Sequence, residues 1–552
     1  MAAGRRRTRP PATGVTKPSE TGAAPARVST HLRGTGARLA GAAALISVLT
    51  ILARLAGFGR TAVFFYTVGD DSLADVYLAT NLVPNIVFEL AAGGALASLV
   101  VPLLAGAVAA GDRRRVDRVV SALLTWVIVL TVPLAVLVFL ISGPITGLFD
   151  IAPEHHEVAA RMLRVFAPQL PLYGIGIVLT GVLQAHHRFA WPVIAPLLSS
   201  VVVMTAYLTY AGIDGVGSDF AGLSRAGELT LSVGTTLGVV ALSLCLLIPV
   251  SRLRLRLRPS LRFPGGEGRQ AVRLGWAGAV TVGAQQVVAA LIVVFAARQM
   301  APYSGAQTLF LLPWAVLAVP LATAVYPRLS AAASEGDETG YAASLSATAR
   351  SVVLLAGFGT AALAGLAIPM TRLMEVPDAV PGVVGFAPGL LGYALFALLS
   401  RALYARGATV AAAVASAVGW LTAGAAVIVA TAVADGPREV YGLGLANAVG
   451  MSVTGLLLVL AVRRHAGRAA LAGLGRAGAA AVVAAAVAGL AGWGVVRALE
   501  ATVWPTPGVF GSIVAGMLGG AVVAGVFAAL AFVLDRRDIG PLVSTLGRRL
   551  RR

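Results

Sequence analysis

The feature that most constrains this chain is a long series of apolar runs of about 20 residues or more, separated by short polar segments. A helix needs about 20 mainly apolar residues to cross the hydrocarbon core of a bilayer. Of the 552 residues, 58% are hydrophobic and 12% are charged, whereas about 25% are charged in a typical soluble domain. The sequence therefore predicts an all-α polytopic membrane protein.

The apolar runs predict about fourteen transmembrane helices. The second run is long enough to be broken or to continue into the cytoplasm. The expected spans are 40–66, 76–108, 119–142, 160–184, 190–212, 229–250, 271–296, 305–327, 345–370, 382–404, 408–434, 440–462, 477–499 and 509–534.

The charged residues predict which way these helices run. The net charge is +19, and 34 of the 43 lysines and arginines lie in the two tails and in alternate connections, which include 111–118, 251–263 and 462–468. The intervening connections, such as 150–157 and 433–439, are richer in acids. Because basic loops stay in the cytoplasm, both termini are expected inside. This clustering between apolar runs also argues against nucleic-acid binding, and the arginine run at 252–258 is expected to lie on anionic lipid headgroups.

Two motifs of the first half recur in the second half. The sequence PLLAGAVAAGD beginning at Pro102 resembles PRLSAAASEGD beginning at Pro327, and FAPQLPLY beginning at Phe166 resembles FAPGLLGY beginning at Phe386. The Gly-Asp ends are expected to close helices 2 and 8, and the Phe-Ala-Pro motifs to open helices 4 and 10. Both shifts equal six helices, so the copies keep one orientation, as in transporters built from parallel repeats with alternating access.

The repeat and the charge pattern divide the chain into segments. The two tails are basic and cytoplasmic, and the N-terminal tail is too polar to form a core and is expected to be disordered. The segments are the tail 1–39, a first six-helix lobe at 40–252, a basic cytoplasmic loop at 253–270, a second six-helix lobe at 271–464, two additional helices at 475–535, and the tail 536–552.

The sequence contains no motif for catalysis or for a bound cofactor. Cys245 is the single cysteine, so no intramolecular disulfide can form. The histidine pairs at 155–156 and 186–187 lack further metal ligands nearby, and no nucleotide-binding or hydrolase signature is present. We therefore expect neither an enzyme nor an ATP-driven pump, and any energy would come from an ion gradient or the membrane potential.

Helix 1 carries two arginines within its apolar run, and an intramembrane charge is a candidate functional site. Arg54 and Arg60 lie about 120° apart around an ideal helix, and Gly57 and Gly59 between them could bend it so that both reach one cavity. Guanidinium groups bind phosphate through paired donors. The alternatives are that Arg60 reaches the outer interface and that Arg54 pairs with Glu89.

Helix 2 carries the other candidate residues. Pro84 removes a backbone donor and is expected to kink the helix, Asn85 can satisfy the freed groups, and Glu89 follows one turn later on the same face. A kink with a buried ion pair to helix 1 is the structural alternative. Asp75 is either a substrate contact or a simple helix-start acid.

These residues resemble a known family, the MurJ (MviN) lipid II flippases of the multidrug/oligosaccharidyl-lipid/polysaccharide exporter superfamily. The likeness covers nearly all of the chain between its tails. It is carried by Arg54 to Arg60 with the sequence RLAGFGR, by Ala74-Asp75, Pro84-Asn85, Gly94-Ala95 and Pro102, by Leu312-Pro313 and Tyr326-Pro327, and by the two Phe-Ala-Pro motifs.

The resemblance implies a transporter of the bacterial cell membrane that moves undecaprenyl-pyrophosphate-linked peptidoglycan precursor from the inner to the outer leaflet. It implies that Arg54 and Arg60 line a cationic central cavity for the headgroup. It further implies that helices 13 and 14 form a groove for the lipid tail, and that proteins of cell-wall synthesis or division are potential partners.

Some residues depart from the family pattern. Phe88 and Glu89 stand where the family has an arginine pair, Gly93 replaces an acid, and Gln307-Thr308 replaces an Asp-Arg pair. The cavity is therefore expected to be less cationic than in other members. Three functions remain open at this point: a lipid II flippase, an exporter of another polyprenyl-linked glycan or of small amphipathic compounds, and an inactive membrane scaffold.

Overall fold

A computed structural model describes residues 30–69, 71–217, 220–263, 267–503, 505 and 508–535 of the chain. Side chains are described in these ranges except at 30–47, 51, 94–95, 97–98, 267–278 and 281. Residues 1–29 and 536–552, on which most of the predicted tails fall, lie outside the described ranges. The chain separates into two units, Met1–Val48 and Leu49–Arg552, and every helix after the first belongs to the second unit.

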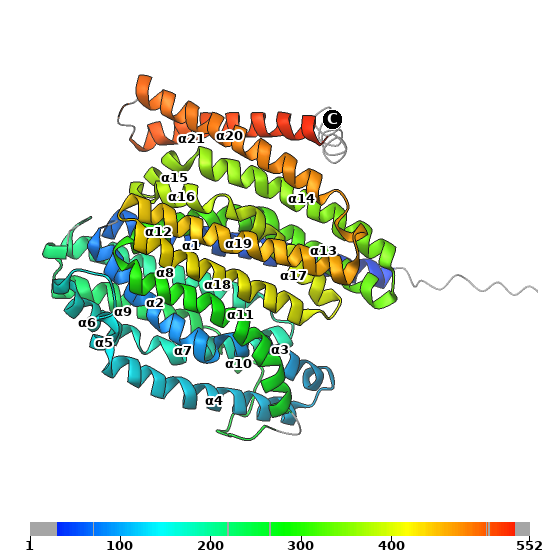
Figure 1. The fold of residues 1–552 in the computed structure, drawn as a ribbon. Coiled ribbons are helices and arrows are strands. Elements are labelled where there is room, and N and C mark those ends of the chain that lie inside the picture. The colour runs from blue at the N-terminus through cyan, green and yellow to red at the C-terminus, as the bar shows by residue number, and fades with distance from the viewer. Residues whose placement is uncertain are drawn as a thin grey trace, which may run out of the picture. The chain divides into compact units, whose positions relative to one another are not determined.

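All regular structure in the described ranges is helical, as predicted (Figure 1). We use first repeat for the helices α1 to α10 and second repeat for α11 to α19. The first repeat comprises α1 (Thr30–Val68), α2 (Ser72–Phe88), η1 (Glu89–Gly93), α3 (Gly94–Ala109), α4 (Arg113–Leu140), α5 (Ser142–Thr146), η2 (Pro153–His155), α6 (His156–Phe166), α7 (Gln169–Ala185), α8 (Ala190–Asp214), η3 (Phe220–Gly222), α9 (Arg225–Leu244) and α10 (Leu247–Ser251). The second comprises α11 (Glu267–Phe295), η4 (Ala297–Gln299), α12 (Met300–Pro313), η5 (Trp314–Ala318), α13 (Val319–Glu335), α14 (Glu338–Gly365), α15 (Ala367–Leu373), η6 (Pro377–Ala379), α16 (Val380–Phe386), α17 (Gly389–Ala405), α18 (Thr409–Val433) and α19 (Pro437–Ala466). The short η7 (Ala469–Leu471) leads to the last two helices, α20 (Leu474–Thr502) and α21 (Val509–Leu534).

Twelve helices of the described chain are long and apolar enough to cross a membrane, and a bent pair brings the number to thirteen. These coincide with the expected spans except for 271–296, which falls on α11; there the apolar stretch within the described residues is Val282–Phe295. The polytopic fold is thus confirmed. The total of fourteen spans and the cytoplasmic position of both ends stay predictions.

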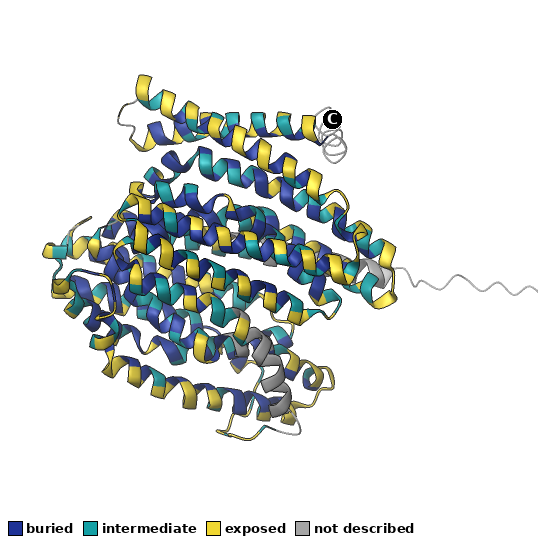
Figure 2. Cartoon of the chain, viewed as in Figure 1, coloured by how far each residue is buried: buried dark blue, intermediate teal, exposed yellow. Residues whose placement is uncertain are grey.

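Large apolar side chains are exposed along the outer faces of several helices, as expected where lipid replaces water (Figure 2). Leu140 at the end of α4 is 70% exposed, Leu490 on α20 is 73% exposed and Val433 on α18 is 76% exposed. Such a surface would be unstable in water. These helices are therefore membrane-spanning elements.

The repeat predicted from two motifs extends to the secondary structure. Helices α4 and α14 each have 28 residues, α7 and α17 each have 17, and α8 and α18 each have 25. The Gly-Asp motifs precede α4 and α14, where Asp112 and Asp337 cap the helices through their side chains. The hydrogen bond from the backbone N–H of Gly340 lowers the pKa of the Asp337 carboxyl.

Each repeat also contains one five-residue π-helical segment at the corresponding position, η1 in the first and η5 in the second. A π segment changes the direction and phase of a helix and often marks a functional site. The predicted break in the second apolar run is therefore real. It falls at Glu89–Gly93, whereas α2 continues through Pro84.

The expectation that Phe-Ala-Pro opens helices 4 and 10 was wrong in detail. Phe166 and Phe386 instead end the short helices α6 and α16, and the next helices begin at Gln169 and Gly389. The motif is a break inside the span, because the proline lacks the backbone donor that would continue the helix. The second copy bends the chain by 57° between Pro377–Phe386 and Gly389–Ala405.

The last two helices lie against α14 (Figure 1), and small residues form the contact between α20 and α14. A Cβ on Gly357 would lie 2.9 Å from the Cβ of Ala481, and one on Gly365 would lie 3.0 Å from the carbonyl oxygen of Gly489. Close approach of backbones is the usual source of helix association in lipid. The alanines and glycines of α20 therefore serve this contact. The predicted lipid-tail groove on helices 13 and 14 stays a prediction.

Candidate functional site

A polar cavity of about 350 Å³ lies between the first repeat and α12 of the second. We call it the Arg60 cavity. It is lined by side chains of α1, α2, α7, α8, α9 and α12, namely Arg60, Thr61, Phe64, Tyr77, Leu78, Asn81, Tyr173, Ser199, Val203, Tyr207, Thr235, Val239, Leu242, Ser304 and Thr308. Because both repeats contribute, a relative movement of the repeats would change the cavity.

Arg60 is the cation that lines this cavity. No carboxylate lies among the lining residues, and within the described part of the chain no ion pair involves Arg60. A guanidinium at membrane depth is costly unless an anion or water compensates its charge. Its five donors suit the oxygens of a phosphate group. The cavity is therefore equipped to bind an anion.

Buried hydroxyl groups in the lining of the Arg60 cavity form hydrogen bonds with one another. The hydroxyls of Tyr77 and Tyr207 lie 2.9 Å apart and share a hydrogen bond, and Tyr77 also bonds the hydroxyl of Thr235. The ring of Phe64 stacks on Tyr77 at a centroid distance of 5.2 Å. These contacts join α1, α2, α8 and α9 and hold this part of the cavity lining in place.

Asn81 is a cavity residue that the sequence analysis missed. It lines the Arg60 cavity, and its buried Oδ1 accepts no hydrogen bond from the protein. A buried amide oxygen without a donor is unfavourable and points to water or a ligand. Asn81 lies one helical turn before Asn85, on the same face of α2, and this spacing was the available signal.

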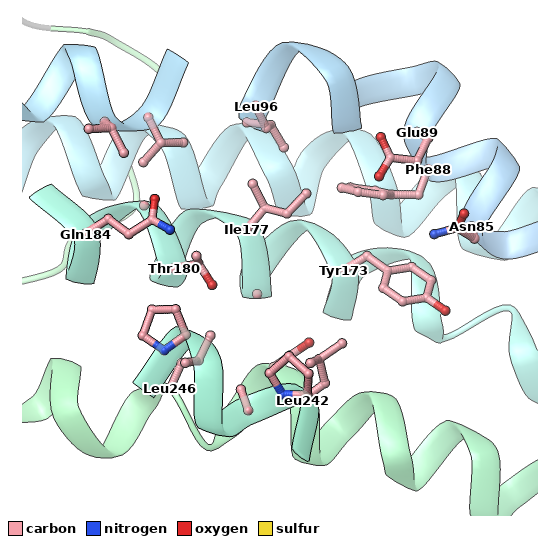
Figure 3. A pocket seen from close by; sticks show the side chains of 18 residues that line it. Asn85, Phe88, Glu89, Leu96, Tyr173, Ile177, Thr180, Gln184, Leu242 and Leu246 are labelled. Carbon is pink, nitrogen blue, oxygen red and sulfur yellow. The ribbon is translucent and has the colours of Figure 1, made fainter. Parts of the chain in front are cut away.

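A second cavity of about 510 Å³ lies within the first repeat (Figure 3). We call it the Glu89 cavity. Its labelled side chains come from α2, η1 and α3, from α7, and from the end of α9 with Leu246 just beyond it. Its lining residues are Asn85, Phe88, Glu89, Leu96, Val100, Val101, Tyr173, Gly176, Ile177, Thr180, Gly181, Gln184, Pro192, Ala195, Pro196, Leu242, Ser243 and Leu246. Tyr173 and Leu242 line both cavities, so the two are neighbours.

Glu89 lies at the start of η1, and its carboxylate folds over Gly93. A Cβ at position 93 would overlap Glu89 Oε2, so a larger residue there would displace this flexible carboxylate. The carboxylate of Glu89 thus occupies the space that a side chain at 93 would enter, which is where the resembled family has its acid. Among the described residues, Glu89 forms no ion pair.

The predicted site residues of helices 1 and 2 are divided between several places. Arg60 lines one cavity, and Asn85 and Glu89 line the other. Arg54 is exposed on α1 and lines neither cavity. Helix α1 continues without interruption through Gly57 and Gly59. In the described chain the alternative ion pair between Arg54 and Glu89 is not formed.

Asp75 joins the two repeats. Its side chain is 7% exposed, and Oδ1 accepts a hydrogen bond of 2.7 Å from the backbone N–H of Ala301 at the start of α12. A carboxylate at a helix N-terminus is favourable because it meets free N–H groups and the positive end of the helix dipole. Arg298 of η4 also forms an ion pair with Asp150, with 3.1 Å between Nη2 and Oδ1. Both contacts link the first repeat to the second, at helix ends that the charge pattern predicts to lie outside.

The departures from the family pattern lie in different environments. Thr308 lines the Arg60 cavity, so a hydroxyl stands there instead of a second cation. The amide of Gln307 donates to the Tyr303 hydroxyl at 3.2 Å and does not line the cavity. Phe88 is 1% exposed and packs against Tyr173. An arginine at position 88 would therefore enter the Glu89 cavity.

Within the described ranges, no group of three or more potential metal ligands is found. The histidine pairs are not part of such a group. His156 forms a hydrogen bond with the backbone carbonyl of Thr146, and His186 forms one with the backbone carbonyl of Val182. Ion pairs elsewhere are structural. The carboxylate of Glu228, for example, is held between Arg161 and Arg225.

The repeated helical bundle and the polar cavity between its repeats define a membrane transporter. The structure is similar to that of an inward-closed lipid II flippase MurJ, with a TM-score of 0.68 over 88% of this chain and 98% of the other, at 16% identity. The chain belongs to the MurJ family, because residues 64–518 match the family described as lipid II flippase MurJ.

Other relatives fit this assignment. The lipid II flippase MurJ of Burkholderia cenocepacia is 26% identical over 65% of this chain and 72% of its own length. A probable lipid II flippase MurJ of Vibrio cholerae is 22% identical over 67% of this chain and 73% of its own. An inward-facing multidrug MATE transporter of the MOP superfamily has the same fold, with a TM-score of 0.61 over 76% of this chain and 94% of the other.

Proposed function

We propose that this protein is a lipid II flippase, which moves the undecaprenyl-pyrophosphate-linked peptidoglycan precursor from the inner to the outer leaflet. The observation that carries the proposal is Arg60, a cation without a described ion-pair partner, in a polar cavity between the two repeats. Membership of the MurJ family supports the substrate. The protein is a secondary transporter, and it acts in the bacterial plasma membrane.

In this proposal Arg60 binds the pyrophosphate through bidentate, charge-assisted hydrogen bonds. Asn81, Ser304 and Thr308 supply neutral hydrogen-bonding groups for the sugar and phosphate oxygens. Arg54, exposed on the same helix, serves as an earlier contact for the entering headgroup. The neutral groups suit a large polar headgroup, whereas a cavity for small amphipathic drugs would be mainly apolar.

Transport proceeds by alternating access. The Asp75–Ala301 hydrogen bond and the Arg298–Asp150 ion pair hold the outer face closed, so both must break before the headgroup can leave outward. A contact that exists in one state only biases the equilibrium between the states. Asp75 therefore acts on the gate and does not bind substrate.

We further propose that no cofactor takes part and that an ion gradient or the membrane potential drives the cycle. Glu89 is the group that would carry a coupling charge, because it is a carboxylate without an ion-pair partner among the described residues and it lines a cavity adjoining that of Arg60. Partners would include the enzymes of cell-wall synthesis or division that use the translocated precursor.

The proposal is tested by expressing the protein in a strain depleted of its own flippase and measuring which leaflet holds lipid II. We expect growth and accumulation of lipid II in the outer leaflet. If the protein reaches the membrane in normal amounts and lipid II remains in the inner leaflet, the substrate is wrong. If the leaflet distribution of a different polyprenyl-linked glycan changes instead, that glycan would replace lipid II as the proposed substrate.

A further inference from the structure

A third cavity is lined by a separate set of residues. It is an open groove of about 580 Å³ bounded by α14, α17, α19, η7 and α20. It shares no lining residue with the Arg60 or Glu89 cavities. Its lining residues are Val353, Leu391, Gly392, Leu395, Ser452, Gly455, Leu456, Val459, Arg463, Arg468, Leu471, Leu474, Gly475, Gly478 and Val482.

The groove is a consequence of how the helices pack. Its floor forms where α17 and α19 meet closely: a Cβ on Gly455 would lie 2.9 Å from the Cα of Gly392. Helix α20 packs instead on α14 and α21. The wall that α20 presents contains Gly475 and Gly478, and a Cβ on either would meet no atom within 4 Å. The missing side chains therefore leave an apolar slot.

The groove has a cationic end. Arg463 lies in the last turn of α19 and Arg468 in the connection to α20, and both line the groove and are exposed. Neither guanidinium forms an ion pair or hydrogen bond with another residue in the part of the chain that the structure describes. By the positive-inside rule this arginine-rich connection lies at the cytoplasmic surface.

We propose that this groove binds an anionic phospholipid of the inner leaflet, with one acyl chain in the slot and the phosphate on Arg463 and Arg468. An apolar slot that ends in two unpaired arginines matches the order of groups in such a lipid, and basic pockets at the cytoplasmic ends of transmembrane helices bind anionic headgroups. The inference does not depend on the proposed flippase function.

The transported lipid is a poorer candidate for this groove. It also has a hydrocarbon tail and phosphate, but its headgroup must reach the Arg60 cavity, which is formed by the first repeat and α12. The groove is formed only by later elements of the chain. A phosphate held by Arg463 and Arg468 is therefore separate from the one that Arg60 would bind.

The test is native mass spectrometry of the full-length, delipidated protein titrated with phosphatidylglycerol, phosphatidylcholine or undecaprenyl phosphate. We expect one tight phosphatidylglycerol site, with phosphatidylcholine bound about tenfold more weakly because it lacks net charge. The double variant Arg463→Ala/Arg468→Ala should weaken phosphatidylglycerol binding by at least about tenfold. Arg464→Ala is the matched control, because Arg464 is adjacent but does not line the groove, and it should bind normally.

A second pair of variants tests the slot. Gly478→Leu should fill it and abolish the site, whereas Gly494→Leu, at another open glycine of α20 outside the groove, should not. Tight binding to the Gly478→Leu protein, or an equal loss with Arg464→Ala, would overturn the proposal. Preferential binding of undecaprenyl phosphate at this site would overturn the choice of ligand. Thermal unfolding of each variant checks the fold, and the arginine variants decide the matter if Gly478→Leu does not fold.

Discussion

The two repeats share a helical scaffold but differ in the residues around their π segments. In the first repeat, Asn85, Glu89 and Tyr173 line a cavity of about 510 Å³ around the π segment η1. At the corresponding places of the second repeat stand Phe310, Trp314 and Tyr393. Their rings stack, with centroids 4.6 Å apart for Trp314 and Tyr393 and 5.8 Å apart for Phe310 and Tyr393. The same π segment borders a cavity with a carboxylate and an amide in one copy, and is packed with aromatic rings in the other.

The difference shows how a duplicated bundle divides its tasks. The aromatic cluster continues to Phe386 and Phe396. The indole N–H of Trp314 donates a hydrogen bond to the carbonyl of Tyr393. The second repeat is therefore closely packed around its π segment. Stacked rings add stability beyond their buried area. The first repeat gives up packing there to place a carboxylate and an amide. We infer that binding chemistry is concentrated in the first repeat.

The largest effect is expected when corresponding residues of the two repeats are truncated to alanine, which tests whether packing and binding are divided between the repeats. Phe310→Ala should lower the free energy of unfolding by about 3–5 kcal/mol, because it leaves a void in a packed aromatic cluster. Asn85→Ala, at the corresponding cavity position, should change it by less than about 0.5 kcal/mol and impair transport instead. Denaturation in detergent micelles measures both. Equal losses of stability would show that the two repeats are packed alike.

A smaller effect is expected where the repeats meet. Asp75→Ala removes the charged acceptor of the Ala301 N–H, worth about 1.5–3 kcal/mol, so the outer face should open more often. Glu154 and Asp378 are both exposed and lie on the side predicted to be outside, and spin labels there would report longer distances in a Cys245→Ser background. Asp75→Asn keeps the oxygen and should have a weaker effect. Unchanged distances in both variants would mean that this contact does not hold the gate.

The smallest expected effect concerns the missing family cation. Thr308→Arg adds a guanidinium to the Arg60 cavity and should tighten headgroup binding by about tenfold, which is about 1.4 kcal/mol. Gln307→Arg is the matched control, because Gln307 lies outside the cavity lining. Binding of labelled lipid II to detergent-solubilised protein measures the difference. Equal gains in both variants would indicate a general charge effect.

Much of this fold could be predicted from the sequence because bilayer length and the positive-inside rule leave few solutions. Apolar run length located the spans, and two short motifs located the repeat. Phe166-Ala-Pro was predicted to open a helix, whereas it interrupts the span between α6 and α7. The sequence could not distinguish these roles, because a proline is compatible with the start of a helix and with an interruption inside one. Only tertiary packing in the folded chain distinguishes these two roles of the proline.

The site was less predictable. Intramembrane charge singled out Arg60 and Glu89, and both line cavities, but helical spacing alone could not show that the cavities are different. Asp75 was ambiguous for the same reason, since its partner Ala301 is distant in sequence and donates a backbone N–H. Asn81 was missed because its signal, the one-turn spacing from Asn85, does not distinguish a neutral amide that lines a cavity from one that only packs in a helix. Its importance lies in the unpaired oxygen, which only the folded chain reveals.

The central claim is that Arg60 binds the transported headgroup. It is tested most directly by reconstituting wild type, Arg60→Ala, Arg60→Lys and Arg54→Ala in proteoliposomes and measuring lipid II translocation per folded molecule. We expect Arg60→Ala to fall to the protein-free rate. Arg60→Lys should recover part of the activity, because an ammonium lacks the bidentate fork, and Arg54→Ala should lose less than Arg60→Ala. Translocation by Arg60→Ala at the wild-type rate would contradict the account.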